Sequence, residues 1–188
     1  MTYSGAVLAG GRSRRFGTDK ARFIWRGKPL LAWVLEGLEG AAERFIVANR
    51  PYPEFGVPVQ PDLLPGGDSL SGLHAALARA RWDWVAVAAC DLPYLTRAYW
   101  DHLYTEAQRG GVRVVAGVGP EGFPEPLAAL YHRSLKEEVE RRLRSGQLRL
   151  GRLLEGEGVR LVPWAVLEAR FGPRLFTNAN TPGDLGAV

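Results

Sequence analysis

The sequence predicts an α/β protein with a mostly parallel sheet, and three observations lead to that prediction. Short apolar runs alternate with amphipathic stretches along most of the chain. One run, residues 84–89, contains no charged residue, which is typical of a strand covered on both faces. Another, residues 6–9, ends in the pair Gly10-Gly11, where backbone amides can approach a bound group closely.

The elements follow from local patterns taken in chain order. Apolar runs predict strands at 3–9, 45–48, 57–60, 84–89, 112–117, 127–131 and 159–162. Apolar residues at helical spacing predict helices at 30–38, 73–81, 96–109 and 134–144. Pro29 suits the first turn of the first helix, and Thr96 can cap the third. Glycine and proline cluster at 51–72 and 117–126, which we expect to form loops over a binding face.

Length and composition limit the class of protein. At 188 residues and 46% hydrophobic, residues 1–188 are expected to form a single domain. No signal-peptide pattern and no run of 18 apolar residues is present, so we expect a cytoplasmic protein without a membrane partner. The net charge is +4, and no basic run is interleaved with aromatics, so no nucleic-acid partner is expected. The single cysteine and three scattered histidines form no zinc pattern, so any metal would have oxygen ligands.

A basic segment follows the glycine pair and indicates a negatively charged ligand. Arg12, Arg14, Arg15 and Lys20 lie within ten residues, so we expect a polyphosphate here. The segment fits neither the ATPase P-loop pattern nor the dinucleotide fingerprint. A turn followed by a solvated basic loop is the alternative that the residues alone leave open.

A lone carboxylate, Asp91, follows the uncharged strand 84–89. In open α/β sheets ligands bind at the carboxyl ends of the strands, where Gly10-Gly11, Asn49 and Asp91 would converge. A carboxylate beside bound phosphates is a natural Mg²⁺ ligand, although Asp91 could also cap the turn before Pro93.

Four collinear blocks extend from the first predicted strand to the end of the chain. They are Leu8-Ala9-Gly10-Gly11-x-Ser13-x-Arg15-x-Gly17-x-Asp19-Lys20, Gly27-Lys28-Pro29-Leu30, Cys90-Asp91-Leu92-Pro93 and Asn178-Ala179-Asn180-Thr181-Pro182-x-Asp184-Leu185. Together they resemble the molybdenum cofactor guanylyltransferase family. The resemblance implies a three-layer, Rossmann-like fold of the GT-A-like nucleotide-diphospho-sugar transferase type. It also implies transfer of GMP from Mg-GTP to the terminal phosphate of molybdenum-molybdopterin, with release of pyrophosphate.

The resemblance also implies roles for particular residues. Catalysis would involve Arg15, Lys20 and Asp91, with Asp91 binding Mg²⁺, for which Mn²⁺ is an alternative. The nucleotide would contact Leu8, Ala9, Gly10, Gly11, Lys20, Asn49, Asp62 and Asp91, with Asp62 on the guanine side. Asn180 and Thr181 would serve the molybdopterin acceptor. Transient partners would be cofactor-insertion proteins or apo-molybdoenzymes.

One segment departs from the family pattern, and two other functions stay open. Many relatives carry Gly-Pro-Leu-x-Gly where this chain has Asp68-Ser69-Leu70-Ser71-Gly72, so only Leu70 and Gly72 match. The nearest alternatives are a cytidylyltransferase for the same cofactor and a sugar-1-phosphate nucleotidylyltransferase. Many of the sugar enzymes carry Leu-Ala-Ala-Gly instead of Leu8-Ala9-Gly10-Gly11, which favours the cofactor branch. A different class is a non-catalytic nucleotide-binding protein that delivers the cofactor.

Overall fold

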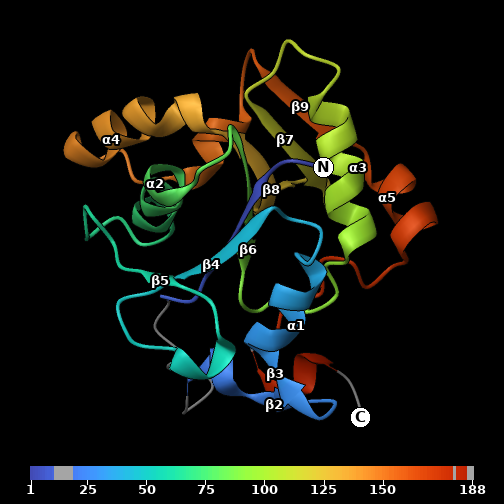
Figure 1. The fold of residues 1–188 in the computed structure, drawn as a ribbon. Helices are drawn as coiled ribbons and strands as arrows, with labels where there is room; N and C mark the ends of the chain where they lie inside the picture. Colours follow the sequence, from blue (N-terminus) through green and yellow to red (C-terminus); the bar gives the residue numbers. More distant parts are fainter. Residues whose placement is uncertain (11–18, 180, 186–188) are drawn as a thin grey trace.

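The computed structural model describes residues 1–10, 19–179 and 181–185. A seven-stranded sheet forms its centre, in the order β5-β4-β1-β6-β8-β7-β9 (Figure 1). Its strands are β1 (Ser4–Leu8), β4 (Glu43–Val47), β5 (Val59–Gln60), β6 (Trp84–Ala89), β7 (Val114–Val118), β8 (Pro124–His132) and β9 (Val159–Val162). Only β8 pairs antiparallel with its neighbours in this sheet. The predicted mostly parallel α/β sheet is therefore confirmed.

Helices cover both faces of the sheet and give three layers (Figure 1). The helices are α1 (Leu30–Gly37), α2 (Ser69–Arg79), α3 (Arg97–Ala107), α4 (Lys136–Arg144) and α5 (Trp164–Phe171). One core cluster joins α1, α3 and α5 to one face, through side chains such as Val34, Trp100 and Leu167. A second core joins α2 and α4 to the other face, through Leu73 and Val139.

Several element boundaries differ from the sequence prediction. The helix expected at 73–81 is Ser69–Arg79, so part of the expected 51–72 loop is helical. Helix α5 and the small hairpin β2 (Ile24–Trp25) with β3 (Lys28–Pro29) were not predicted. The strand expected at 127–131 is longer, because β8 begins at Pro124 and shortens the expected 117–126 loop. These errors fall where glycine and proline lie inside or beside elements that tertiary contacts stabilise.

The β2–β3 hairpin connects the start of α1 with the C-terminal segment. Trp25 and Leu30 are buried together with Ala179 in a separate small core. Trp33 Nε1 donates to the Trp25 carbonyl at 2.8 Å, and the two rings meet edge to face at 5.4 Å. This aromatic cluster fixes the C-terminal motif against the end of the sheet.

The carboxyl ends of β1 and β6 meet at the point where the chain changes direction within the sheet. From β1 the chain builds outward through β4 and β5, and it then returns to the other side of β1 as β6. Leu8 pairs with Ala89, so Gly10 and Asp91 follow at the same edge. This is the topological switch point, where open α/β sheets bind ligands. In the described ranges, no helix is long and apolar enough to cross a membrane.

Candidate nucleotide-binding site

The strand order places the predicted site residues in a row along one edge of the sheet. Asp62 follows β5, Asn49 follows β4, Gly10 follows β1 and Asp91 follows β6. Adjacent strands lie about 4.8 Å apart, so three strand spacings from β5 to β6 extend over about 14 Å. The row therefore has the length of an extended nucleotide.

Lys20 and Asp91 form the contact at the centre of this row. Lys20 Nζ donates to Asp91 Oδ2 at 3.0 Å, and the two side chains are only 19% and 14% exposed. Lys20 begins a short 3-10 helix, Lys20–Arg22, whose N-cap is Asp19. Residues 71 positions apart in sequence thus meet where β1 and β6 end.

The other oxygen of Asp91 suits a metal ion. Oδ1 is buried, and among the described residues it has no hydrogen-bond partner. A buried carboxylate oxygen without a donor is costly unless a cation or another ligand completes it. No cluster of three His, Cys, Asp or Glu side chains that could hold a metal occurs in the described part of the chain. A single carboxylate such as that of Asp91 suits Mg²⁺, which usually takes one or two carboxylates together with phosphate oxygens and water.

The end of β1 leaves room for a ligand at Gly10. The Leu8 carbonyl accepts from Cys90 N at 3.2 Å and Ala9 N donates to the Val47 carbonyl at 2.9 Å, so both residues are tied into the sheet. Gly10 is exposed, and a Cβ added there would meet no atom of the described residues within 4 Å. Gly11 and Arg15, which we predicted to complete this phosphate site, lie outside the described residues.

Tyr52 is a supporting residue that the sequence analysis missed. Its buried hydroxyl donates to Asp19 Oδ2 at 2.9 Å, and Asp19 Oδ1 accepts from Ala21 N at 3.1 Å. Burial, followed by this hydrogen bond, raises the pKa of Tyr52 above its usual value. Tyr52 therefore fixes the residue that immediately precedes Lys20. A lone tyrosine in a proline-rich stretch gave no sequence signal for this role.

Asn49 and Asp62 pair by two hydrogen bonds at the β4–β5 end of the row. Asn49 Nδ2 donates to Asp62 Oδ2 at 3.0 Å, and Asp62 N donates to Asn49 Oδ1 at 2.9 Å. The amide thereby orients the carboxylate of Asp62. Sequence reasoning named both residues but did not predict that they contact each other.

The departure after Asp62 has a structural explanation. Ser71 Oγ accepts from Gly67 N at 2.9 Å and donates to the Leu64 carbonyl, which closes the loop onto α2. A Cβ at Gly72 would lie 2.9 Å from Leu8 Cδ1, so the glycine lets α2 pack against the end of β1. Gly72 is one of the two residues that match the family pattern. Its packing against Leu8 does not depend on the proline that many relatives carry earlier in this segment.

The C-terminal motif also reaches this edge. Ala179 N donates to the Asp91 carbonyl at 2.8 Å, which joins the motif to the central carboxylate. Thr181 N donates to Asp184 Oδ2 at 2.7 Å, so Asp184 stabilises the turn that carries Thr181. Asn180, expected on the acceptor side, lies outside the described residues.

A further carboxylate, Glu125, lies on the other side of Asp91 and was not predicted. Strand β8 pairs Ala128 with Ala88, and continuing this register brings Glu125 opposite Asp91. Burial, followed by the charge of Asp91, raises the pKa of Glu125 above its usual 4.5. The antiparallel course of β8 is what brings its first residues to this edge, and the sequence pattern did not indicate that direction.

Cys90 does not offer nucleophilic chemistry. Burial, followed by the charge of Asp91, raises the pKa of its thiol to about 12. A thiol with this pKa is almost entirely protonated at neutral pH, and it is the thiolate that attacks. Cys90 is therefore a packing residue beside Asp91.

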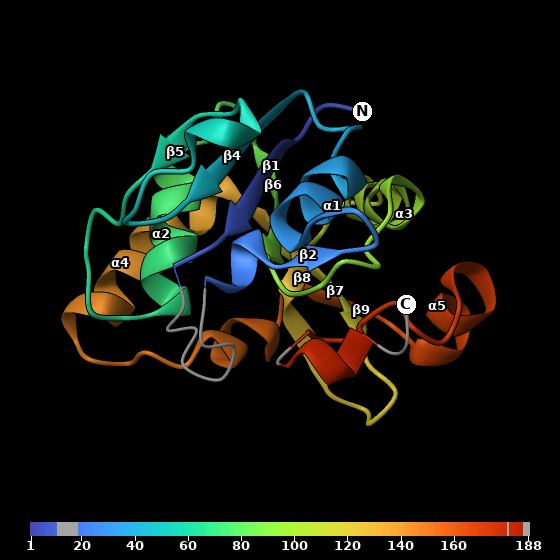
Figure 2. The ribbon, with the colours of Figure 1, turned by 90° about the horizontal axis from the view of Figure 1, so that it is seen from below.

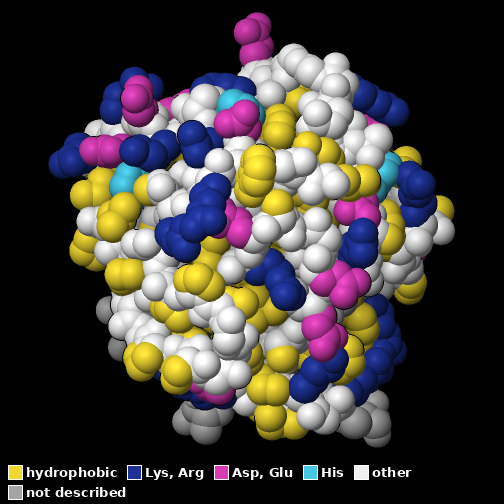
Figure 3. Space-filling model, viewed as in Figure 1, with side chains coloured by type: hydrophobic (Ala, Val, Ile, Leu, Met, Phe, Trp, Pro, Cys, Tyr) yellow, Lys and Arg dark blue, Asp and Glu magenta, His cyan; other side chains and the backbone are white. Residues whose placement is uncertain are grey.

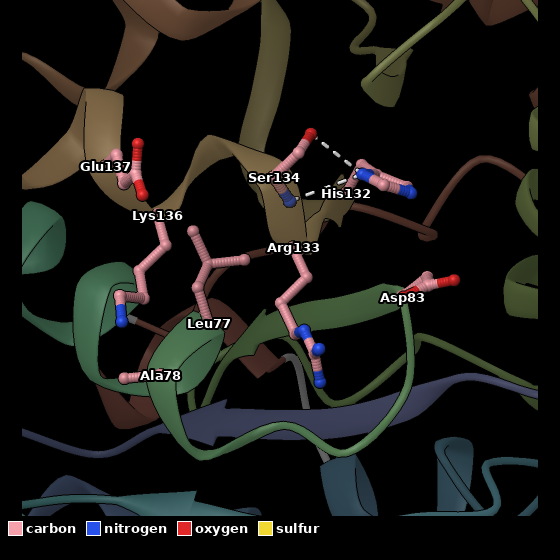
Figure 4. Close-up of a pocket in the computed structure, with 8 residues that line it drawn as sticks. All are labelled: Leu77, Ala78, Asp83, His132, Arg133, Ser134, Lys136 and Glu137. Carbon is pink, nitrogen blue, oxygen red and sulfur yellow. Dashed lines mark hydrogen bonds between the residues drawn. The ribbon is translucent and has the colours of Figure 1, made fainter.

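A hollow of the described surface lies away from this row. It has a volume of about 560 Å³ and lies at the opposite end of the sheet, beside Asp83 and His132 (Figure 4). Arg133 at its wall donates to the carbonyls of Ala80 and Arg81, which marks it as a tie between segments. On the face in Figure 3, basic side chains are interspersed with acidic and apolar ones, and no single basic stripe is visible there.

Comparisons with known proteins identify the family. The family description "MobA-like NTP transferase domain" matches residues 5–161. A probable molybdenum cofactor guanylyltransferase of Deinococcus radiodurans is 39% identical, over 100% of this chain and 94% of the relative. One of Pyrococcus furiosus is 34% identical, over 96% and 93%. The crystal structure of molybdopterin-guanine dinucleotide biosynthesis protein A from Archaeoglobus fulgidus superimposes with a TM-score of 0.83 at 31% identity, covering 97% of this chain and 94% of that one. The predicted GT-A-like nucleotidyltransferase fold is confirmed, and the chain belongs to the MobA-like NTP transferase family.

Proposed function

We propose that this protein is a molybdenum cofactor guanylyltransferase, which transfers GMP from GTP to the terminal phosphate of molybdopterin. The observation that carries the proposal is the contact of Lys20 with Asp91 beside Gly10, at the switch point of the sheet. It joins a cation for phosphates and a carboxylate for a metal at the edge where nucleotides bind in such folds. The names of the relatives support guanine as the base and the molybdenum cofactor as the acceptor.

Base selection is assigned to Asp62, oriented by Asn49. A carboxylate accepts from both the ring N1–H and the exocyclic amine of guanine, whereas adenine offers no such donor pair. The two hydrogen bonds between Asn49 and Asp62 reduce the freedom that the carboxylate would lose on binding.

The phosphates are assigned to the centre of the row. Gly10 and Gly11 would supply close backbone approach, and Lys20 and Arg15 would neutralise the triphosphate. Asp91 would hold Mg²⁺ through the oxygen that accepts no hydrogen bond among the described residues. When bound, Mg²⁺ withdraws charge from the phosphoryl oxygens and favours departure of pyrophosphate.

The reaction balances without a covalent protein intermediate. An oxygen of the acceptor phosphate forms a bond to the α-phosphorus of GTP, and the bond from that phosphorus to the bridging oxygen breaks. Pyrophosphate leaves with the electron pair. Positioning and charge neutralisation account for catalysis of this kind, and Asn180 and Thr181 would hold the acceptor.

The wider context follows from these substrates. We propose that residues 1–188 act as a single domain, because one sheet edge carries the assigned groups that the structure describes. GTP is available in the cytoplasm, which is where we place the reaction. Cofactor-insertion proteins or apo-molybdoenzymes would receive the product by transient contact.

Pyrophosphate release tests the proposal directly. The protein is incubated with Mg²⁺, molybdopterin and GTP, CTP, ATP or UTP in turn, and pyrophosphate is measured. We expect release with GTP that depends on the acceptor. A preference for CTP would replace this function by cytidylyl transfer, and GTP binding without any release would support the non-catalytic delivery protein.

A further inference from the structure

The β7–β8 turn, residues 119–123, extends beyond the edge that carries Asp91. Strand β6 pairs with β8 only as far as Ala88 with Ala128, so the first residues of β8 continue past the last pair. Beyond that point β8 pairs only with β7, through Pro124 and Val118. Figure 2 shows this turn, in yellow, projecting from the body of the protein. The turn therefore flanks the site on the side away from Asn49 and Asp62.

Phe123 at this turn is exposed to an unusual degree for a large aromatic residue. It is 71% exposed, more than any other large hydrophobic residue of the described chain. The turn itself is well defined, because Gly119 N donates to the Phe123 carbonyl at 2.8 Å and Gly122 N donates to the Gly119 carbonyl at 3.0 Å. Gly122 adopts a φ of 87°, which glycine tolerates without strain. The backbone that carries the ring is thus fixed by its own hydrogen bonds.

The position of Phe123 relative to Asp91 fits a particular ligand size. Glu125 lies opposite Asp91 in the continued register, and Phe123 is two residues further out. Two residues of extended chain add about 7 Å, and one strand spacing adds about 5 Å at right angles to it, so the backbone of Phe123 lies about 9 Å from the backbone of Asp91. A ring carried on a short arm from a phosphate at Asp91 would reach this distance.

We propose that Phe123 is the platform on which the ring system of the acceptor stacks, and that it determines specificity for a planar heteroaromatic acceptor. The inference rests on the proposed function. The row of site residues assigns the base to the β4–β5 end and the phosphates to β1 and β6, which leaves the β8 side for the acceptor. Aromatic side chains stack on heteroaromatic rings, as they do on the bases of single-stranded nucleic acids.

The test compares four variants at residue 123 and one control. Phe123→Ala and Phe123→Leu remove the aromatic face, whereas Phe123→Trp and Phe123→Tyr retain it. Val166→Ala on α5 is the control, because Val166 is also an exposed hydrophobic residue and lies on the helix that follows β9, which is not a strand of the row. The KM values for molybdopterin and for GTP are measured separately by pyrophosphate release.

We expect the KM for molybdopterin to rise at least tenfold in Phe123→Ala and at least fivefold in Phe123→Leu. It should stay within threefold in the Trp and Tyr variants and in the control, with the KM for GTP within twofold throughout. An unchanged acceptor KM in Phe123→Ala, or a rise equal to that for GTP, overturns the proposal. So does full activity of Phe123→Leu, since leucine is apolar but cannot stack.

A binding measurement separates this inference from the reaction itself. The fluorescence of a simple pterin, 6-carboxypterin, is titrated with the protein in the presence of GTP and no metal. Quenching by the wild type that is at least tenfold weaker in Phe123→Ala supports the platform even if no pyrophosphate is ever released. Equal quenching by both proteins overturns the platform while leaving guanylyl transfer untouched.

Discussion

The two halves of the site differ in how many of their polar side chains are already paired within the protein. On the side of β5, β4 and β1, polar side chains pair with each other: Asn49 with Asp62, Tyr52 with Asp19, and Lys20 with Asp91. On the β8 side, Glu125 is a half-buried carboxylate whose pKa is raised by burial and by the charge of Asp91, and Phe123 faces solvent. Preorganised groups bind with a smaller entropic loss, so the first half is suited to one fixed ligand. The second half depends on its ligand for completion.

The largest effect is expected from Asp91, which joins the two halves. Asp91→Asn should lower turnover by about 10²- to 10³-fold, because a charge that stabilises the transition state is lost. Pyrophosphate release measures turnover, and circular dichroism checks the fold. Asp83→Asn is the matched control, since Asp83 is exposed just before β6, at the opposite end of the same strand. Normal turnover of Asp91→Asn would remove the metal assignment.

A smaller effect is expected from Asp62, the residue assigned to the guanine base. Asp62→Asn should raise the KM for GTP by about ten- to hundredfold, because a hydrogen bond to a charged group contributes about 1.5–3 kcal/mol. The same substitution should affect inosine triphosphate less, since inosine lacks the exocyclic amine. Asn49→Ala should lie between Asp62→Asn and wild type, because it leaves the carboxylate present but unoriented.

The control for Asp62→Asn is Asp68→Asn. Asp68 is an exposed aspartate in the next loop, and asparagine tolerates the positive φ of that position. Equal losses with guanosine and inosine triphosphates would assign Asp62 to another part of the nucleotide.

Tyr52 tests whether the first half is completed before the nucleotide binds. Tyr52→Phe removes the hydrogen bond to Asp19 and should lower the free energy of unfolding by about 1 kcal/mol, measured by urea denaturation without ligand. Tyr94→Phe is a suitable control, since its hydroxyl accepts only from Arg174 at 3.2 Å in the described structure. An unchanged stability would mean that Asp19 is fixed by its other contacts.

Glu125 provides the smallest effect and tests the incomplete half. Its pKa is higher in the folded protein than its ordinary 4.5, so its ionisation opposes folding. The stability that this residue contributes is therefore present below pH 4.5 and is lost as the pH rises through the folded pKa. Glu125→Gln should raise Tm at pH 8 relative to wild type, and the difference should vanish below pH 4.5.

Exposed Glu121 on the same turn supplies the control variant, Glu121→Gln. A Tm difference for Glu125→Gln that is the same at pH 4 and pH 8 would mean that ionisation of Glu125 does not oppose folding.

The sequence predicted most of the strands and the site row, but not its internal contacts. Residues 84–89 and Thr96 behave as expected, since Thr96 Oγ1 accepts from Tyr99 N at the start of α3. Helix α5 was missed, and α2 was predicted four residues too late because Gly66, Gly67 and Gly72 read as loop residues. A glycine in the sequence indicates a turn only where the tertiary structure does not need it for close packing. Gly72 is needed for close packing, because α2 lies directly against Leu8 there.

By itself the sequence determined the local features: buried apolar strands, the glycine pair after the first of them, and a lone carboxylate after β6. These depend on side-chain periodicity and backbone freedom, which neighbouring residues set. Only the tertiary structure decided the strand order, the reversed direction of β8, and the meetings of Lys20 with Asp91 and of Ala179 with Asp91. Those features depend on which distant segments bury their apolar faces together, a choice made by the whole core and not by local pattern.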